Sequence, residues 1–263
     1  MPKSIGLTCA ALLLPCLLGV SRPCAAEDFD AGTVWEDSKA YFTAPLHWGS
    51  REWLYLGGTV LAVGAAHSFD DNVRTHFAIG ERARLDGKDP HSSRDALPAA
   101  ALVAGTFAYA WLIDDQTGRV ESYSMVEAAA LSAVTTTALK FVAGRQRPNE
   151  TSDENAWRNS GSSFPSLHTS AAFAIGTVFA ESGNDEYRWV RRVVGYGMAG
   201  ATAYVRMKDN VHWLSDTVAG AAIGIATAQF VLHRRDARQH LGQMSVGPSQ
   251  DGGIQLSYQI ALH

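Results

Sequence analysis

Six apolar stretches rich in alanine and glycine constrain the fold of this chain more than any other feature. Each stretch is long enough for a helix, and few runs of β-branched residues interrupt them, which favours helix over strand. The stretches are Trp53–His67, Ala96–Ile113, Met125–Leu139, Ser166–Ala180, Val193–Val205 and Thr217–His233. The sequence therefore predicts a mainly α protein.

Composition narrows the class of protein. The 263 residues suit one domain with tails. The charged share is 18%, below the roughly 25% that is usual for soluble domains. The net charge is −4, so the chain lacks the basic excess of nucleic-acid-binding proteins. We expect no nucleic-acid partner.

The N-terminus resembles an export signal. Lys3 supplies the positive charge, Ile5–Val20 is the apolar run, and residues 24–26 offer small side chains for cleavage. An uncleaved anchor helix is the alternative. All three cysteines lie within residues 1–26, so cleavage there leaves a mature chain without disulfides or thiolate metal ligands. We predict a signal peptide at 1–26 and an exported protein.

The rest of the chain divides into three parts. Residues 27–52 are predicted to be an irregular or partly helical lead-in, and residues 53–240 the helical domain. Within that domain, the polar segment 69–95 indicates a short helix and a loop, and the Ser/Asn/Asp-rich segment 149–163 indicates another loop. In the tail, residues 241–263, Ile254, Leu256 and Tyr258 alternate with polar residues, which predicts a small β-hairpin.

Membrane topology is ambiguous from the sequence. A spanning helix needs about 20 mainly apolar residues, and Ala96–Ile113 comes closest. Arginines follow the fourth and sixth stretches, which predicts that those ends are cytoplasmic; they are Arg188, Arg191, Arg192, Arg234, Arg235 and Arg238. Six spans then require a cytoplasmic N-terminus, whereas a cleaved signal puts it outside. We expect membrane association, with a soluble or peripheral periplasmic domain as the alternative.

Three short motifs carry the chemistry. The first runs from Lys140 to Pro148 and includes Arg147, and the second is Pro165-Ser166-Leu167-His168. The third joins Arg206, His212 and Asp216. If consecutive helices run antiparallel, these motifs meet at one end of a bundle. Helix N-termini at that end present N–H groups and a positive dipole to an anion.

The residue types in these motifs suit phosphoryl transfer. Lys140, Arg147 and Arg206 supply the fixed positive charges that a transferring phosphoryl group requires. His212 and Asp216 are four residues apart, so we expect them on one face of a helix. Asp216 can then fix the imidazole tautomer and leave the other ring nitrogen to attack phosphorus. His168 can protonate the leaving oxygen and later activate water.

Together the motifs resemble the signature of the type 2 phosphatidic acid phosphatase superfamily, which includes class A acid phosphatases, lipid phosphate phosphatases and vanadium haloperoxidases. That signature reads Lys-x6-Arg-Pro, Pro-Ser-Gly-His and Ser-Arg-x5-His-x3-Asp. The resemblance implies a helical bundle with a core of about six helices. It implies that His212 forms a phosphohistidine, Asp216 orients it and His168 is the general acid and base. Phosphate binding falls to Lys140, Arg147, Ser166, Leu167 and Arg206, with no metal or cofactor.

Two positions depart from the signature. Leu167 replaces a glycine whose backbone N–H faces the phosphate, and only that N–H is needed for binding. Its side chain can narrow the site or make it more apolar, which favours lipid substrates. Val205 replaces a serine next to Arg206 and removes one hydrogen bond, worth about 0.5–1.5 kcal/mol. Neither change deletes a catalytic group.

We therefore expect a metal-independent phosphatase that acts on phosphomonoesters or diphosphates of lipids, with its active site facing the periplasm. Candidate substrates are phosphatidic acid, phosphatidylglycerol phosphate, undecaprenyl diphosphate and lipid A phosphates. The alternatives are a soluble nonspecific acid phosphatase, a vanadate-dependent haloperoxidase and a non-enzymatic envelope protein. His168, His212 and Asp216 have the residue types of metal ligands, but three converging cations repel a divalent ion.

Overall fold

The computed structural model describes residues 31–80, 85–89, 92–183, 185–242, 244–248 and 254–258. The helices are α1 (Ala31–Thr43), η3 (Ala44–His47), α2 (Ser50–His67), α3 (Asp70–Phe77), α4 (Ser92–Asp95), α5 (Leu97–Leu112), α6 (Gln116–Ala143), α7 (Leu167–Glu181), η5 (Asp185–Tyr187), α8 (Arg188–Lys208) and α9 (Leu214–Gly242). Two strands follow, β1 (Met244–Pro248) and β2 (Ile254–Tyr258). The predicted signal peptide at 1–26 lies outside the described residues.

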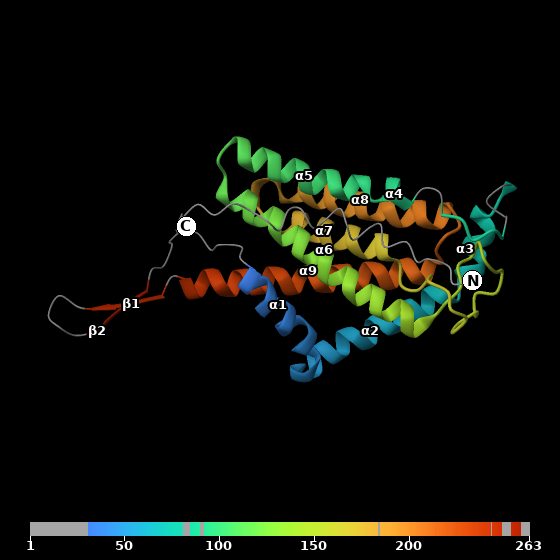
Figure 1. Ribbon diagram of the computed structural model, residues 1–263, viewed down its shortest axis with the longest axis horizontal. Helices are drawn as coiled ribbons and strands as arrows, with labels where there is room; N and C mark the ends of the chain where they lie inside the picture. The colour runs from blue at the N-terminus through green and yellow to red at the C-terminus, as the bar shows by residue number, and fades with distance from the viewer. Residues whose placement is uncertain are drawn as a thin grey trace.

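The prediction of a mainly α bundle is confirmed. The six apolar stretches correspond to α2 and α5 to α9, and Figure 1 shows the five helices α5 to α9 running lengthwise along one bundle. The lead-in is helical over Ala31–Thr43. The tail pairs β1 antiparallel with β2, with Val246 opposite Leu256, at the position where the alternation predicted a hairpin.

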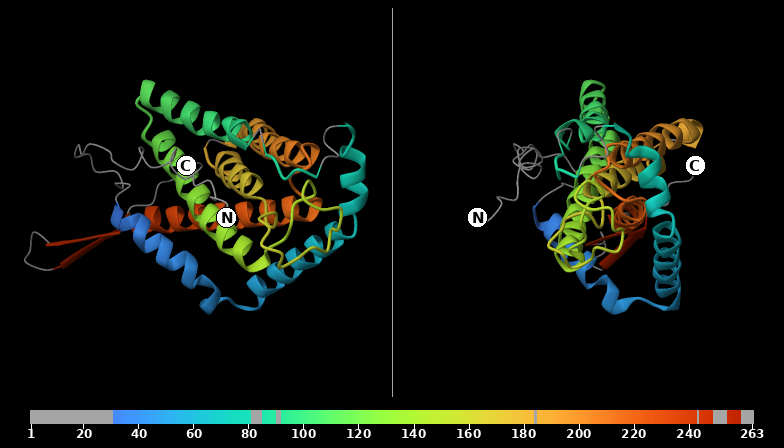
Figure 2. Two further views of the ribbon diagram at one scale, coloured as in Figure 1. Left: turned by 45° about the vertical axis from the view of Figure 1, so that its right-hand side comes forward. Right: turned by 90° about the vertical axis from the view of Figure 1, so that its right-hand side faces the viewer.

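Helix α7 is the centre of the bundle. Figure 2 shows it enclosed by α6, α8 and α9. It crosses α8 where Gly176 meets Gly195: a Cβ added to Gly195 would lie 2.4 Å from the Gly176 carbonyl oxygen. Glycines at this crossing let the two backbones touch, and buried alanines, valines and methionines fill the space around it. The rigid centre fixes the N-terminal end of α7, where the second motif lies.

Helix α1 packs along the C-terminal part of α9. Its buried Asp37 accepts hydrogen bonds from Arg234, at 2.9 Å, and from Arg238. The Tyr41 hydroxyl lies 2.8 Å from the Thr227 hydroxyl, and its ring packs edge-on against Phe230. These contacts lie at the end of α9 opposite the motif residues, so they stabilise the scaffold rather than the site.

Within the described residues, three helical segments are long and apolar enough to cross a membrane: Ser92–Leu112, Gln116–Ala143 and Leu214–Arg238. The first of them contains most of Ala96–Ile113, the stretch that came closest to a span in the sequence. The second contains a charged residue, Glu127, whose side chain is buried inside the bundle. Large apolar side chains are exposed on several helices; examples are Trp53, Leu54 and Leu61 on α2, Tyr109, Trp111 and Leu112 on α5, Phe141 and Val142 on α6, and Trp189 and Val193 on α8.

Candidate active site

The three motifs lie together at one end of the bundle. Lys140 is in the last turn of α6, and Ser166 caps the N-terminus of α7, with Leu167 and His168 in its first turn. Arg206 is in the last turn of α8, and Asp216 is in the first turn of α9. Gly144, with φ 54°, ends α6 in the left-handed conformation and donates its N–H to the Lys140 carbonyl. The chain then turns towards Arg145 and Arg147.

His212 and Asp216 form a buried pair with a different geometry from the one expected. His212 precedes α9, which begins at Leu214, so the two residues do not share a helix face. The Asp216 carboxylate reaches back over the helix N-terminus, accepting the Trp213 N–H at 2.9 Å and lying 3.4 Å from His212 Nδ1. This contact between the Asp216 side chain and the Trp213 N–H is one of the two hydrogen bonds of a capping box, the one in which the third helical residue accepts the N–H of the residue before the helix. The Ser163 hydroxyl also donates to Asp216, so its acceptor oxygens are held on several sides.

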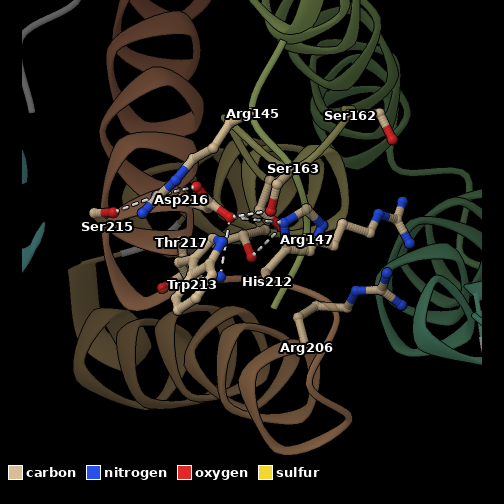
Figure 3. A network of polar contacts seen from close by, with 12 residues as sticks. Arg145, Arg147, Ser162, Ser163, Arg206, His212, Trp213, Ser215, Asp216 and Thr217 are labelled. Atoms are coloured by element: carbon tan, nitrogen blue, oxygen red, sulfur yellow. Dashed lines mark hydrogen bonds and ion pairs between the residues drawn. The ribbon is translucent and has the colours of Figure 1, made fainter. Parts of the chain in front are cut away.

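Arg145, which the sequence did not single out, is fully buried behind this pair. Its Nη1 lies 2.8 Å from Asp216 Oδ1 and 2.8 Å from the Ser215 hydroxyl. Figure 3 shows Arg145 and Asp216 on one side of His212, and the guanidinium groups of Arg147 and Arg206 on the other. One arginine therefore supports the His–Asp pair, and two others face the opposite side.

Arg147 and Arg206 hold a common carboxylate. Asp89 Oδ2 lies 2.9 Å from Arg147 Nη1 and 2.5 Å from Arg206 Nη2, and Asp95 lies 2.5 Å from Arg206 Nη1. Burial alone raises the pKa of Asp89, but the hydrogen bond and charge of Arg206, together with the charge of Arg147, outweigh it and hold the pKa at about 2. The arginine pair thus binds an oxyanion of about the width of a phosphate edge.

Lys140 and Ser166 border the same region through backbone contacts. The Lys140 ammonium donates to the carbonyls of Ser162 and Ser163, at 2.5 and 3.2 Å. The Ser166 N–H donates to the Asp216 carbonyl at 3.0 Å, which ties the start of α7 to the start of α9. Leu167 is the first residue of α7, so its N–H lies among those that a helix leaves without an internal partner.

His168 lies against α4. Its Nε2 is 2.9 Å from the Ser92 carbonyl oxygen, which can only accept, so Nε2 carries a proton and donates it. Burial lowers the pKa of His168 to about 4, and the positive charge of Arg206 contributes to the shift. The ring is therefore neutral near pH 7 in this arrangement.

His212 is also held neutral. Burial lowers the pKa of His212 well below its usual value, and the charges of Lys140, Arg206 and Arg147 lower it further. A neutral imidazole whose Nδ1 faces a carboxylate keeps a lone pair on Nε2, which is the form that a nucleophile requires.

Among the residues that the structure describes, no group of three or more His, Cys, Asp and Glu side chains is arranged to hold a metal ion. The carboxylates near the site are engaged by arginines instead: Asp89 and Asp95 by Arg206, and Asp216 by Arg145.

Sequence reasoning missed Arg145, Asp70, Asp89 and Asp95. Arg145 lies inside the first motif, between Lys140 and Arg147, and this position is a signal that is visible in the sequence. The three aspartates belong to the polar segment 69–95. Nothing in that segment alone identifies which arginine each carboxylate contacts, because the partners are 58 to 117 residues away along the chain.

Comparison with known proteins matches residues 122–240 to the PAP2 superfamily. A lipid A 1-phosphatase from Porphyromonas gingivalis is 37% identical over 90 residues, which is 34% of this chain. The aligned stretch spans only 18% of that relative's length. No solved structure matches the chain.

Proposed function

Because residues 122–240 match the PAP2 superfamily, we propose that this protein is a phosphatase of that superfamily, which hydrolyses lipid phosphomonoesters or diphosphates through a phosphohistidine intermediate. The observation that carries the proposal is that the guanidinium groups of Arg147 and Arg206 lie on the side of His212 away from Asp216 (Figure 3), where they share the Asp89 carboxylate. Two arginines that already bind an oxyanion beside a neutral, carboxylate-paired histidine have the arrangement that phosphoryl transfer needs.

In the first step, a phosphate group replaces Asp89 on Arg147 and Arg206, and Lys140 adds a third positive charge. The Nε2 lone pair of His212 attacks phosphorus, forming a P–N bond while the P–O ester bond breaks. Asp216 accepts the Nδ1 proton of His212 in a hydrogen bond and stabilises the positive charge that develops on the ring. Binding of the phosphate dianion first draws a proton from solvent onto His168, and the resulting imidazolium gives this proton to the leaving alkoxide, which departs as the alcohol.

In the second step, water attacks the phosphohistidine. His168, now lacking that proton, takes one from the water as the P–O bond forms. The P–N bond breaks, inorganic phosphate leaves, and His212 regains its neutral form. The pKa of His168 is about 4 without substrate. A bound phosphate dianion raises it, so the substrate itself favours the acid form needed first, and the ring that has given up this proton is the base of the second step.

A lipid substrate is supported by three features. Three helices are apolar enough to span a membrane, large apolar side chains are exposed on α2, α5, α6 and α8, and the matching relative is a lipid A 1-phosphatase. Leu167 adds an apolar side chain at the start of α7. We infer that the protein resides in the membrane of the cell envelope, with the active-site end facing the periplasm. The opposite end carries the arginines at the start of α8 and near the end of α9; we call it the arginine-rich end, and it faces the cytoplasm.

The direct test is phosphate release by the purified protein in detergent with EDTA present. The panel holds para-nitrophenyl phosphate, phosphatidic acid, undecaprenyl diphosphate and lipid A 1-phosphate. We expect EDTA-resistant turnover that falls at least about 1,000-fold in His212→Ala but is retained in His233→Ala, an exposed histidine on α9 near the opposite end of the bundle.

Each other outcome points to a named alternative. Preference for para-nitrophenyl phosphate indicates a nonspecific acid phosphatase, and EDTA-sensitive turnover indicates a metal-dependent enzyme. No turnover on the panel, combined with halide oxidation by peroxide and vanadate, indicates a haloperoxidase. No reaction in either assay contradicts the enzyme proposal and supports a binding role in the envelope.

A further inference from the structure

We propose that Arg145 is a positioning residue for the nucleophile: it fixes Asp216 and Trp213, and through them the tautomer and orientation of His212. The inference deepens the proposed function and rests on it for the role of His212. Neither the motif reasoning nor the comparisons assign a role to Arg145.

Every N–H donor of the buried Arg145 guanidinium has a partner. Nη1 donates to Asp216 Oδ1 and the Ser215 hydroxyl, both at 2.8 Å. Nη2 donates to Asp70 Oδ2 and to the Glu154 carbonyl, both at 2.7 Å, and Nε donates to the same carbonyl at 3.2 Å. These contacts account for all five donors of arginine, a fork that lysine cannot reproduce.

The far side of Arg145 is anchored by Asp70, the first residue of α3. Its carboxylate is fully buried and accepts the Ser215 N–H at 2.8 Å and the Ser215 hydroxyl at 2.6 Å. Asp70 also faces His67 Nδ1 at 2.8 Å. Arg145 therefore joins the α2–α3 corner to the first turn of α9, and the position of Asp216 is set from both sides.

Arg145 also positions His212 through the indole of Trp213, the residue that follows the nucleophile. The Arg145 guanidinium packs against the rings of both Trp157 and Trp213, 4.5 and 5.0 Å from their centroids. The Trp213 indole N–H donates to the Gln146 carbonyl at 2.9 Å, and its backbone N–H donates to Asp216. Because Trp213 follows His212 directly, fixing this indole also fixes the backbone that carries the imidazole.

The phosphate-binding cations do not belong to this network. Arg147 and Arg206 contact Asp89, and Lys140 contacts the Ser162 and Ser163 carbonyls. Loss of Arg145 should therefore slow the chemical step while binding of a phosphate analogue is preserved. A role confined to general stability would produce no such separation between kcat and analogue affinity.

The experiment compares Arg145→Met and Arg145→Lys with Arg191→Met as the matched control. Arg191 also makes an ion pair with a buried carboxylate, Glu121, but on α8 towards the opposite end of the bundle. We expect Arg145→Met to lower kcat about 100-fold and leave the inhibition constant for orthovanadate within about threefold. Arg191→Met should retain kcat. Arg145→Lys keeps the buried charge and hence the fold, and it should still lose about tenfold in kcat because the fork is gone.

A second readout does not depend on turnover. In ¹⁵N-histidine-labelled protein, with the His212 signals assigned by His212→Gln, we expect an Nδ1-protonated ring in wild type and a mixture of tautomers in both Arg145 variants. A wild-type tautomer in these variants, or kcat within threefold of wild type in Arg145→Lys, would overturn the proposal. If wild type releases no phosphate, the proposed function fails, and the NMR spectra still decide whether Arg145 positions His212.

Discussion

At the scale of single residues, the contact most open to test is the carboxylate of Asp89 on Arg147 and Arg206. A phosphate that binds these arginines has to displace it, so Asp89 competes with substrate. Asp89→Asn removes the competing charge, while Asp95 still holds Arg206. We expect the inhibition constant for orthovanadate to fall about three- to tenfold, equivalent to about 0.7–1.4 kcal/mol, as measured by inhibition of para-nitrophenyl phosphate hydrolysis.

Glu150→Gln is the control for this change. It removes a nearby negative charge, but Glu150 accepts a bond from the Arg147 backbone N–H and not from its guanidinium. The inhibition constant of orthovanadate for Glu150→Gln should stay close to the wild-type value. Weaker vanadate binding by Asp89→Asn would show that the carboxylate orients the arginines instead of competing for them.

His168 makes a second prediction at this scale, about pH. Its pKa of about 4 is caused by burial first and by Arg206 second. A dianion bound beside His168 raises the pKa of the ring, because its negative charge favours the imidazolium. Anion binding therefore draws a proton onto His168, and by linkage the affinity for the anion rises as the pH falls. Sulfate suits the test because its own charge is constant over this range. We expect its affinity to increase about tenfold from pH 7.5 to pH 5, measured by calorimetry.

In His168→Asn that increase should be largely lost, since Asn does not titrate. An unchanged slope in this variant would assign the proton to another group, such as His212, whose pKa is also lowered by burial and whose ring interacts electrostatically with His168.

The convergence of the three motifs at one end of the bundle could be predicted, because the order of the helices and the place of each motif at a helix end are visible in the sequence. Their partners could not. Arg145 meets Asp70 and Asp216 only after α3 and α9 have packed, and a buried arginine and an exposed one look the same in a sequence. The helical spacing of His212 and Asp216 was visible, but the start of α9 at Leu214 was not.

At the scale of helices, apolar content located the segments better than it located their ends. Helix α6 begins at Gln116, nine residues before the predicted stretch. Its polar first turns lie outside the apolar stretch. Asp115 caps the helix locally through the Thr117 N–H, whereas Glu121 pairs with Arg191 on α8, 70 residues away along the chain. A polar residue such as Glu121 can be buried when it has a partner on another helix, so composition alone does not show where a helix begins or which of its faces is buried.

The α7–α8 crossing gives a prediction at this scale, with a control two residues away. Gly195→Ala places a Cβ about 2.4 Å from the Gly176 oxygen, so the helices must separate, at a cost of about 1–3 kcal/mol in the free energy of unfolding. Gly197→Ala on the same helix meets nothing within 4 Å and should stabilise by about 0.5–1 kcal/mol through helix propensity. Denaturant unfolding in detergent measures both, and equal effects would mean that this crossing is not tightly packed.

At the scale of the whole molecule, the number of apolar stretches is not the number of lipid-facing helices. Helix α7 is enclosed by α6, α8 and α9 (Figure 2), so its apolar residues serve the core. Six spans would require a cytoplasmic N-terminus, whereas a smaller, odd number of spans is compatible with an external one. Three segments qualify as spans in the part of the chain that is described, and the sequence alone could not separate them from core helices.

The proposed orientation can be tested by cysteine labelling in right-side-out membrane vesicles. The three native cysteines, all within residues 1–26, are first replaced by serine. Single cysteines are then introduced at Ser152, in the exposed loop at the active-site end, and at Asp236, whose side chain is 61% exposed near the arginine-rich end of α9. Because positively charged ends stay cytoplasmic, we expect a membrane-impermeant maleimide to label position 152 at once and position 236 only after permeabilisation.

Labelling of position 236 alone would reverse the orientation and place the active site in the cytoplasm. Labelling of both positions before permeabilisation would mean that the bundle does not cross the membrane, and that its exposed apolar helices attach it to the periplasmic face.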